Sequence, residues 1–341
     1  MPPQIDAHRN DGIVHAKTRH GLALPVIDVT HPRFAVADDA KSLEAQREAF
    51  LKWDRERRRV PKFVTRLMLH FAAKRSPLVR AIFQSDKGFL DSITTYMMKL
   101  GEQNLPPGFD GRIDRKIAAS PHTVFIRLRM QQIAKLLAEA LVAPLGESPG
   151  VPLHFINIAG GPALDSINAV ILLNRDRPDL LTRSIVIHVL DAQDDGPFFG
   201  ANALTALKSE RGPLHRLNVD FEHQPYDWNE TAPLSQLVAE LQSRGAILAA
   251  SSEGGLFEYG GDEAIIANLT ALRAGVKLVA GSVTSASDMR KQMIAETRFR
   301  IVPRGIEGFA PLAAQAGYRI AKTEPAILSD QVLLQWNATA A

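Results

Sequence analysis

The sequence predicts an α/β fold with a seven-stranded, mainly parallel sheet, helices on both faces of that sheet, and an N-terminal helical domain. Two observations predict this fold. Beyond residue 149, short apolar runs alternate with amphipathic stretches, which is typical of the βαβ units that build parallel sheets. Before residue 149, apolar residues recur mainly at helical spacing, which predicts a group of packed helices.

The character of the sequence changes near segment 146–151, which contains two glycines and a proline. We therefore expect two domains. Residues 1–148 are expected to form an arm and a helical lid or substrate domain, and residues 149–341 the α/β domain. In the first domain, the expected elements are an extended segment at Leu24–Val29 and helices within 40–101 and over His122–Val142.

The α/β domain is expected to contain strands that are short apolar runs bounded by turn residues. These strands are Leu153–Ile158, Ile185–Leu190, Leu217–His223, Ala246–Ala250, Lys277–Ala280, Phe299–Val302 and Val332–Trp336. The helices expected between them are Ala163–Asn174, Ala201–Ser209, Leu234–Ser243, Asp262–Ala274, Ser287–Glu296 and Glu307–Ala316.

The composition excludes several classes of function. Of the 341 residues, 45% are hydrophobic and 23% are charged, as in ordinary soluble globular proteins. A net charge of +3, from 40 basic and 37 acidic residues, is too balanced to predict a nucleic-acid partner. The absence of cysteine excludes disulfides and thiol nucleophiles, and the histidines lack metal-ligand spacing, so no metal is expected. No apolar run is long enough to cross a membrane, so the cytoplasm is the expected location.

A glycine turn follows the first strand of the α/β domain. In open parallel sheets, ligands bind beyond the carboxyl ends of the strands, and Gly160-Gly161-Pro162 lies at such an end, directly before a helix. Glycines allow a ligand close to the backbone, and the helix N-terminus attracts a carboxylate or accommodates a ribose. The Gly-x-Gly-x-x-Gly spacing of dinucleotide-binding turns is missing.

An acid ends the next strand. Asp191 follows Ile185–Leu190 directly, so its carboxylate is expected beside the glycine turn, where it can accept hydrogen bonds from both hydroxyls of a ribose.

With these motifs, residues 120–336 resemble the class I S-adenosylmethionine-dependent methyltransferases, whose fold is Rossmann-like. The resemblance implies that Gly160 and Gly161 lie against the methionine part of the cofactor and that Asp191 holds its ribose. It also implies an acid near the adenine amine, which is either Asp220 or Asp227; we favour Asp227, because the adjacent indole of Trp228 offers a stacking face. We also expect Pro162, Asp165, Ser251 and Ser252 at the cofactor. The resemblance further implies an arginine against the methionine carboxylate, which is either Arg127 or Arg129; we take Arg129 as the candidate.

The loop after the fourth strand carries the candidate catalytic residues. Methyl transfer requires a positioned acceptor, exclusion of water and, for some acceptors, removal of a proton. Glu253, Glu258 and Tyr259 are the nearest polar groups to that reaction, and we expect them to orient or deprotonate the acceptor.

The expected function is therefore S-adenosylmethionine-dependent methylation of a small-molecule acceptor, with the helical domain as lid and as a candidate homodimer surface. Two alternatives remain at this stage. An NAD(P)-dependent oxidoreductase requires a Gly-x-Gly turn, and this turn is not present. A non-catalytic module that binds an adenosyl ligand requires only the cofactor residues.

Overall fold

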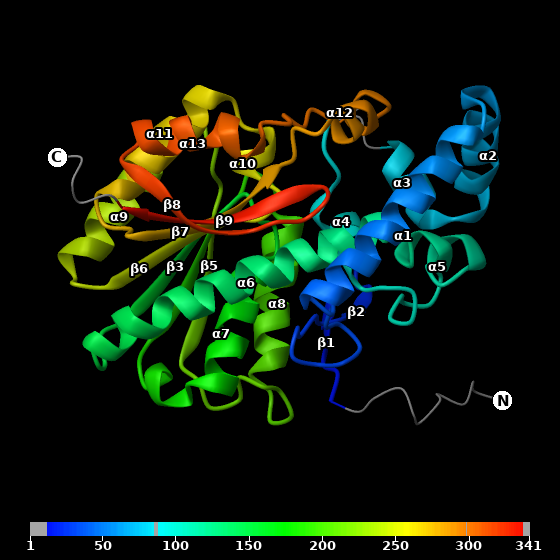
Figure 1. Ribbon diagram of the computed structural model, residues 1–341. Coiled ribbons are helices and arrows are strands. Elements are labelled where there is room, and N and C mark those ends of the chain that lie inside the picture. Colours follow the sequence, from blue (N-terminus) through cyan, green and yellow to red (C-terminus); the bar gives the residue numbers. More distant parts are fainter. Residues whose placement is uncertain (1–11, 85–87, 298, 337–341) are drawn as a thin grey trace.

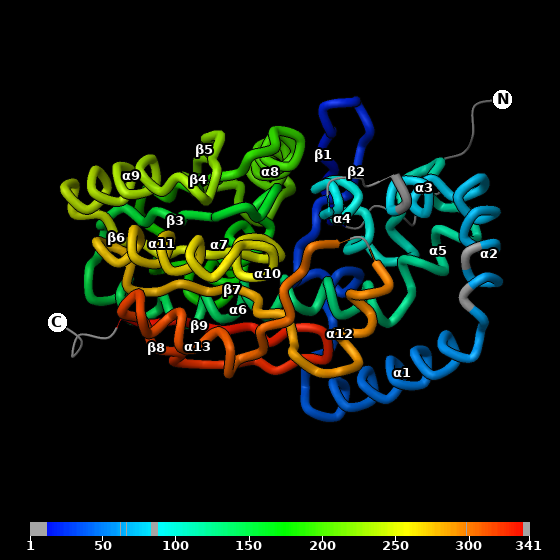
Figure 2. The backbone as a smooth tube through the Cα atoms, turned by 90° about the horizontal axis from the view of Figure 1, so that it is seen from above, coloured from blue at the N-terminus to red at the C-terminus, as the bar shows by residue number. Residues whose placement is uncertain are grey.

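The structure is a computed structural model that describes residues 12–84, 88–297 and 299–336. The α/β part and a layer of helices lie side by side, and the long helix α6 (Pro121–Glu147) runs from one into the other (Figures 1 and 2). Within these ranges, no helix combines the length and the apolar composition needed to cross a membrane.

The central sheet has seven strands in the order β5-β4-β3-β6-β7-β9-β8. Neighbouring strands from β5 through β7 pair in parallel, whereas β9 pairs antiparallel with both β7 and β8. The expected seven-stranded, mainly parallel sheet is thus confirmed. The strands are β3 (Leu153–Ile158), β4 (Ile185–Leu190), β5 (Val219–Gln224), β6 (Ile247–Ser252), β7 (Leu278–Thr284), β8 (Tyr318–Glu324) and β9 (Ser329–Trp336).

Helices cover both faces of the sheet, each over its own apolar core. Burial of these apolar faces is the main force that holds the layers together. One face carries α6, α7 (Leu164–Asp176) and α8 (Asp195–Leu207); the other carries α9 (Ala232–Ser243), the short α10 (Leu256–Tyr259), α11 (Asp262–Arg273) and α13 (Gly305–Gln315). A 3₁₀ turn, η2 (Pro178–Leu181), connects α7 to β4.

The helical layer lies beyond the carboxyl ends of the strands β3, β4 and β6. Asp39, Asp91 and Ser120 cap three of the helices of the first 150 residues by accepting a hydrogen bond from a backbone N–H. The elements of this layer are α1 (Ala40–Arg59), α2 (Lys62–Arg75), α3 (Pro77–Gln84), α4 (Ser92–Lys99), α5 (Arg112–Ala118) and, from the C-terminal half, α12 (Asp288–Ala295), with the small hairpin β1 (His15–Lys17) and β2 (Ala23–Pro25) beside α8.

Helix α6 belongs to both parts. It is buried along most of its length because it packs against α1 and α4 at one end and against α7, β7 and β9 along the rest. The division of the chain at residues 148 and 149 therefore stays a prediction, since α6 contributes to the core under the sheet.

The predicted strand Phe299–Val302 is wrong, because this segment is irregular. Its backbone bonds connect different parts of the molecule. The N–H of Arg300 donates to the carbonyl of Gly88 at 2.9 Å. The N–H of Val302 donates to the carbonyl of Glu258 at 2.8 Å. The segment thus links the helical layer to α10 instead of joining the sheet.

The missing strand is β8, which the sequence analysis did not predict. As the edge strand next to β9, β8 has mostly exposed or half-buried residues after Tyr318 and carries charged side chains such as Lys322 and Glu324. Edge strands of this kind have a weak apolar pattern, which explains why it was missed.

Two histidines stack between β3 and β4. The rings of His154 and His188 lie 5.1 Å apart at 12° to each other, and Nδ1 of His154 is 2.8 Å from Nε2 of His188. Burial lowers the pKa of each imidazole to about 4, and in His154 the neighbouring ring adds to this effect.

We expect the free energy of unfolding to decrease as the pH falls from 6.5 to about 4, because there the unfolded chain binds protons on these two rings and the folded chain does not. Urea unfolding at several pH values in this range measures the effect. His154→Gln should weaken this pH dependence, whereas His215→Gln, at an exposed position, should leave it intact. Identical pH dependence in both variants would contradict the assignment.

Candidate functional site

A cavity of about 1070 Å³ lies between the carboxyl ends of the strands and the helical layer. Single ligand sites commonly have volumes of about 300–1,000 Å³, so this cavity is large enough for a nucleoside-sized molecule and a second small molecule. Its polar end is lined by Gly160, Gly161, Asp191 and Trp228, and its apolar end by residues that include Trp53, Leu69, Val79, Met98, Ile113, Phe125, Met293 and Leu328.

The glycine turn after β3 requires glycine for a specific reason. A Cβ atom at Gly160 would lie 2.1 Å from Oδ1 of Asn157, which is a severe clash with a buried side chain. Gly161 has a φ of +58°, a left-handed conformation that glycine adopts at little cost. The turn therefore packs closely against the side chain of Asn157. Gly160, Gly161 and the following Pro162 all line the cavity.

Asp191 points at the glycine turn. Its Oδ2 accepts a hydrogen bond from the N–H of Gly161 at 2.9 Å, and its Oδ1 accepts one from the N–H of Gln193 at 2.8 Å. Burial raises the pKa of Asp191, and these two hydrogen bonds oppose the rise. A carboxylate has about four lone-pair positions, so two remain for a ligand in the cavity that Asp191 lines.

Of the two candidate acids after the third strand, only one reaches the cavity. Asp227 and Trp228 both line it. Asp220 lies on β5 with an exposed side chain, 3.9 Å from Nζ of Lys208, and does not line it. The hydroxyl of Tyr226 donates to Asn268 at 2.6 Å and so anchors the loop that carries Asp227.

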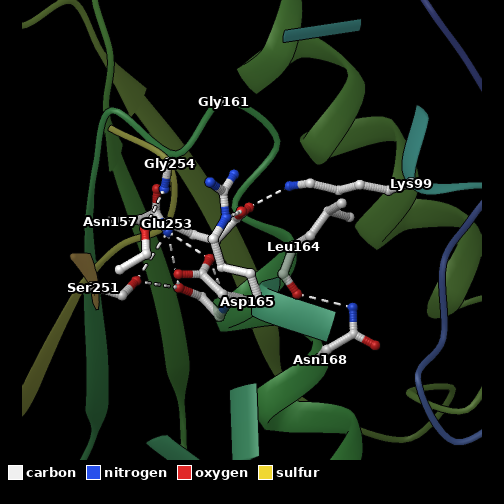
Figure 3. Close-up of polar contacts among 12 residues, drawn as sticks. Lys99, Asn157, Gly161, Leu164, Asp165, Asn168, Ser251, Glu253 and Gly254 are labelled. Atoms are coloured by element: carbon white, nitrogen blue, oxygen red, sulfur yellow. Dashed lines mark hydrogen bonds and ion pairs between the residues drawn. The ribbon is translucent and has the colours of Figure 1, made fainter. Parts of the chain in front are cut away.

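Four charges form an ion cluster at the cavity wall: the buried Lys99, Glu253 and Glu258 and the largely buried Arg129. Nε of Arg129 donates to Glu253 at 2.7 Å, and its Nη1 donates to both oxygens of Glu258 at 2.9 and 3.0 Å. Lys99 reaches from α4 to the other oxygen of Glu253 (Figure 3). Although burial opposes ionisation, Lys99 and Arg129 lower the pKa of Glu253. Both glutamates are thus bound to cations.

A second polar cluster supports the turn without lining the cavity. Nδ2 of Asn157 donates to Asp165 at 2.7 Å and to Oγ of Ser251 at 3.0 Å (Figure 3). Oγ of Ser252 accepts a hydrogen bond from the N–H of Leu256 at 2.9 Å. Asp165, Ser251 and Ser252 are buried and do not line the cavity. Their hydrogen bonds instead hold the loops whose other residues line it. Burial, and next the charge of Glu253, raises the pKa of Asp165 to about 6.

The remaining predicted residues are placed as follows. Tyr259 lines the cavity, and burial raises its pKa to about 12, which keeps the phenol neutral. Arg129 lines the cavity, whereas Arg127 does not and lies against Gly101. His223 is partly buried and contacts the carbonyl of Asp191 at 3.0 Å.

The cavity residues that the sequence did not predict include Lys99, His122 and Arg290. They lie on α4, α6 and α12, which are far apart in the sequence. The available signal was weak. Lys99 ends the apolar run Tyr96-Met97-Met98, and His122 lies in the first turn of a predicted helix, but neither position has a motif that identifies a site.

No family model and no curated protein matches the chain. Solved structures do match. The magnesium protoporphyrin IX methyltransferase from Synechocystis PCC 6803 with bound SAH is 16% identical, with a TM-score of 0.42, over 63% of this chain and 87% of that chain. The methyltransferase CalO1 of calicheamicin biosynthesis, also with SAH, is 13% identical, with a TM-score of 0.35, over 67% of this chain and 59% of that chain.

A third match is the O-methyltransferase NcsB1 of neocarzinostatin biosynthesis, which is 16% identical, with a TM-score of 0.36, over 63% of this chain and 57% of that chain. The matches thus span less than two thirds of the length of CalO1 and NcsB1. At these identities the similarity is one of fold alone. The strand order and the single reversed strand β9 give the chain the Rossmann-like fold predicted from its resemblance to class I S-adenosylmethionine-dependent methyltransferases.

Replacing Glu253 by glutamine should strongly destabilise the protein. Glu253→Gln leaves Lys99 and Arg129 buried with one carboxylate between them, and breaking a buried ion pair in this way costs about 3–5 kcal/mol of unfolding free energy. Urea unfolding near pH 7.5 measures the loss. Glu240→Gln, which removes an exposed partner of Arg244, is the control and should change stability little. A loss no larger than that of the control would contradict this account of the cluster.

Replacing Asp165 by asparagine, also an acid-to-amide change, should stabilise the protein instead. The folded-state pKa of about 6 lies above the unfolded value, so the charged carboxylate reduces stability above pH 6. Asp165→Asn should therefore raise the unfolding free energy at pH 7.5 by about 1–3 kcal/mol, with the gain disappearing toward pH 4. Asp176→Asn, an exposed control, should show no such gain. Destabilisation by Asp165→Asn at neutral pH would contradict a destabilising charge at Asp165.

Proposed function

We propose that the chain is an S-adenosylmethionine-dependent methyltransferase that acts on a small-molecule acceptor. The observation that carries the proposal is the 2.9 Å hydrogen bond between the N–H of Gly161 and the carboxylate of Asp191, at one end of a cavity of about 1070 Å³. The glycine turn and the strand-tip acid therefore converge on one ligand position, which has room for a second molecule beyond it.

The lining residues fit the cofactor. Asp191 retains lone pairs for two ribose hydroxyls, and the exposed backbone of Gly160 and Gly161 suits the methionine part. Asp227 and Trp228 offer an acceptor for the adenine amine and a stacking face for the ring. In Arg129, Nη2 makes no hydrogen bond to a described residue, so it is available for the methionine carboxylate.

When bound, the cofactor supplies a methyl group on a sulfonium centre. The protein positions the acceptor and keeps water out, which is the task of the apolar wall formed by the helical layer. Among the proposed catalytic residues, Tyr259 is a neutral hydrogen-bond donor that can orient the acceptor. Glu253 and Glu258 act on the reaction by holding Arg129, because their oxygens are occupied by cations.

The size and the largely apolar lining of the helical end favour a small molecule over a nucleic acid as the acceptor. A cytoplasmic location, independence of metal ions and a homodimer formed through the helical layer belong to the same proposal.

Calorimetry with S-adenosylhomocysteine tests the proposal through a matched pair of acids. Asp191→Asn should weaken binding about tenfold or more, because it removes a charged acceptor from the ribose position. Asp220→Asn, the neighbouring acid that does not line the cavity, should bind like the wild type. Thermal unfolding of both variants checks that they are folded.

Equal affinity of the two variants would refute the assignment of the ribose site. Tighter binding of NADH than of S-adenosylhomocysteine by the wild type would favour an oxidoreductase instead. Release of the methyl group to an acceptor, measured over a panel of metabolites, separates a methyltransferase from a binding module.

A further inference from the structure

Arg290 is a buried arginine without a partner among the described residues. It lies on α12, at the boundary between the helical layer and the α/β part (Figures 1 and 2). The residue is 8% exposed and lines the cavity. Its Nε is buried with no hydrogen-bond partner, and within the described ranges of the chain its guanidinium makes no hydrogen bond or ion pair. Burying an unpaired cation is costly, so such a group indicates a missing anion.

The other cations at the cavity differ from Arg290 in this respect. Lys99 and Arg129 share Glu253 and Glu258. Arg57 binds Asp54 and Glu296, and Lys116 is exposed to solvent.

The groups that face Arg290 do not neutralise it. Burial lowers its pKa; Glu258 and Tyr259 oppose this, and Arg129 adds to it. Of these, Glu258 already accepts two hydrogen bonds from Arg129, at 2.9 and 3.0 Å. His122, also on the cavity wall, has its pKa lowered to about 3 by burial and then by Arg290, Arg129 and Arg57, so it remains neutral. Arg290 is therefore the cation at this end of the cavity that no described carboxylate pairs with.

The cavity that Arg290 lines is otherwise largely apolar. Met293, one turn further along α12, lines the same cavity, as do aromatic and aliphatic residues of neighbouring segments. A ligand that satisfies both features has an apolar body and one anionic group. The aromatic and aliphatic residues that line the cavity with Met293 include Trp53, Phe125, Phe299, Ile301 and Leu328.

We propose that Arg290 binds a carboxylate-type anion of the methyl acceptor, so that the substrate class is an apolar, aromatic-sized organic acid. The inference rests on the proposed methyltransferase function and adds its substrate class. Nη2 of Arg129 lies beside Gly254 and makes no hydrogen bond to a described residue, so Arg129 remains available for the carboxylate of the cofactor. A neutral analogue of the acceptor leaves Arg290 unpaired, and a buried polar group left unpaired is a strong basis for discrimination.

The test uses two fluorescent probes of similar shape. 8-Anilinonaphthalene-1-sulfonate has an apolar aromatic body with an oxyanion, and N-phenyl-1-naphthylamine is the neutral counterpart. Each is titrated into the wild type, Arg290→Gln and Lys291→Gln, with and without saturating S-adenosylhomocysteine. Lys291→Gln is the matched control, because it removes one positive charge from the same helix at an exposed position.

We expect Arg290→Gln to weaken binding of the anionic probe about tenfold or more while binding of the neutral probe is retained. Lys291→Gln should bind both probes like the wild type. In the wild type, 2-naphthoate should displace the anionic probe at a lower concentration than 2-naphthamide does, a comparison that requires no variant. Arg290→Lys should keep part of the preference for the anion, because it retains the charge but loses the planar fork.

Several results would overturn the proposal. These are unchanged affinity of Arg290→Gln for the anionic probe, equal loss of both probes, or no preference of the wild type for the naphthoate. Loss of S-adenosylhomocysteine binding by Arg290→Gln with the anionic probe unaffected would instead assign Arg290 to the cofactor. Failure of the wild type to bind S-adenosylhomocysteine refutes the methyltransferase proposal separately, since the probe titrations without that ligand still report on Arg290.

Discussion

The buried ion cluster of Lys99, Arg129, Glu253 and Glu258 joins the two parts of this protein. Lys99 comes from α4 and Arg129 from α6, whereas the glutamates come from the loop after β6 and from α10. An unpaired charge in this position would be costly, so the four groups must be held together and the helices that carry them are held with them. The cluster thereby connects α4 and α6 to the loop after β6 and to α10 at the cavity wall.

The two ends of the cavity differ in how their polar groups are satisfied. At the sheet edge, Asp191 accepts hydrogen bonds from the backbone of Gly161 and Gln193, and the site is preformed. At the helical end, Arg290 has no partner among the described residues. A preformed site suits a cofactor that is common to many reactions, and an uncompensated charge in apolar surroundings suits recognition of one class of acceptor.

The irregular segment 299–302 shows how the fold serves this arrangement. Its backbone bonds to Gly88 and to Glu258 tie the helical layer to α10, and Phe299 and Ile301 line the cavity. A strand at this position would have used the same backbone groups within a sheet. The apolar pattern that suggested a strand instead reflects burial against the cavity.

The sequence by itself determined the alternating architecture, the bounds of strands β3 and β4, and the expectation that the glycine turn and Asp191 meet, which the hydrogen bond between Gly161 and Asp191 confirms. These features depend on local patterns and on the rule that parallel strands end at one edge of the sheet. Only the tertiary structure decided that Asp227 and not Asp220 lines the cavity, that Glu253 and Glu258 are bound to cations, and that β8 completes the sheet. Ion pairs and cavity walls are made by side chains from distant elements such as α4, α6 and α12, and no local pattern encodes which of these side chains will come together.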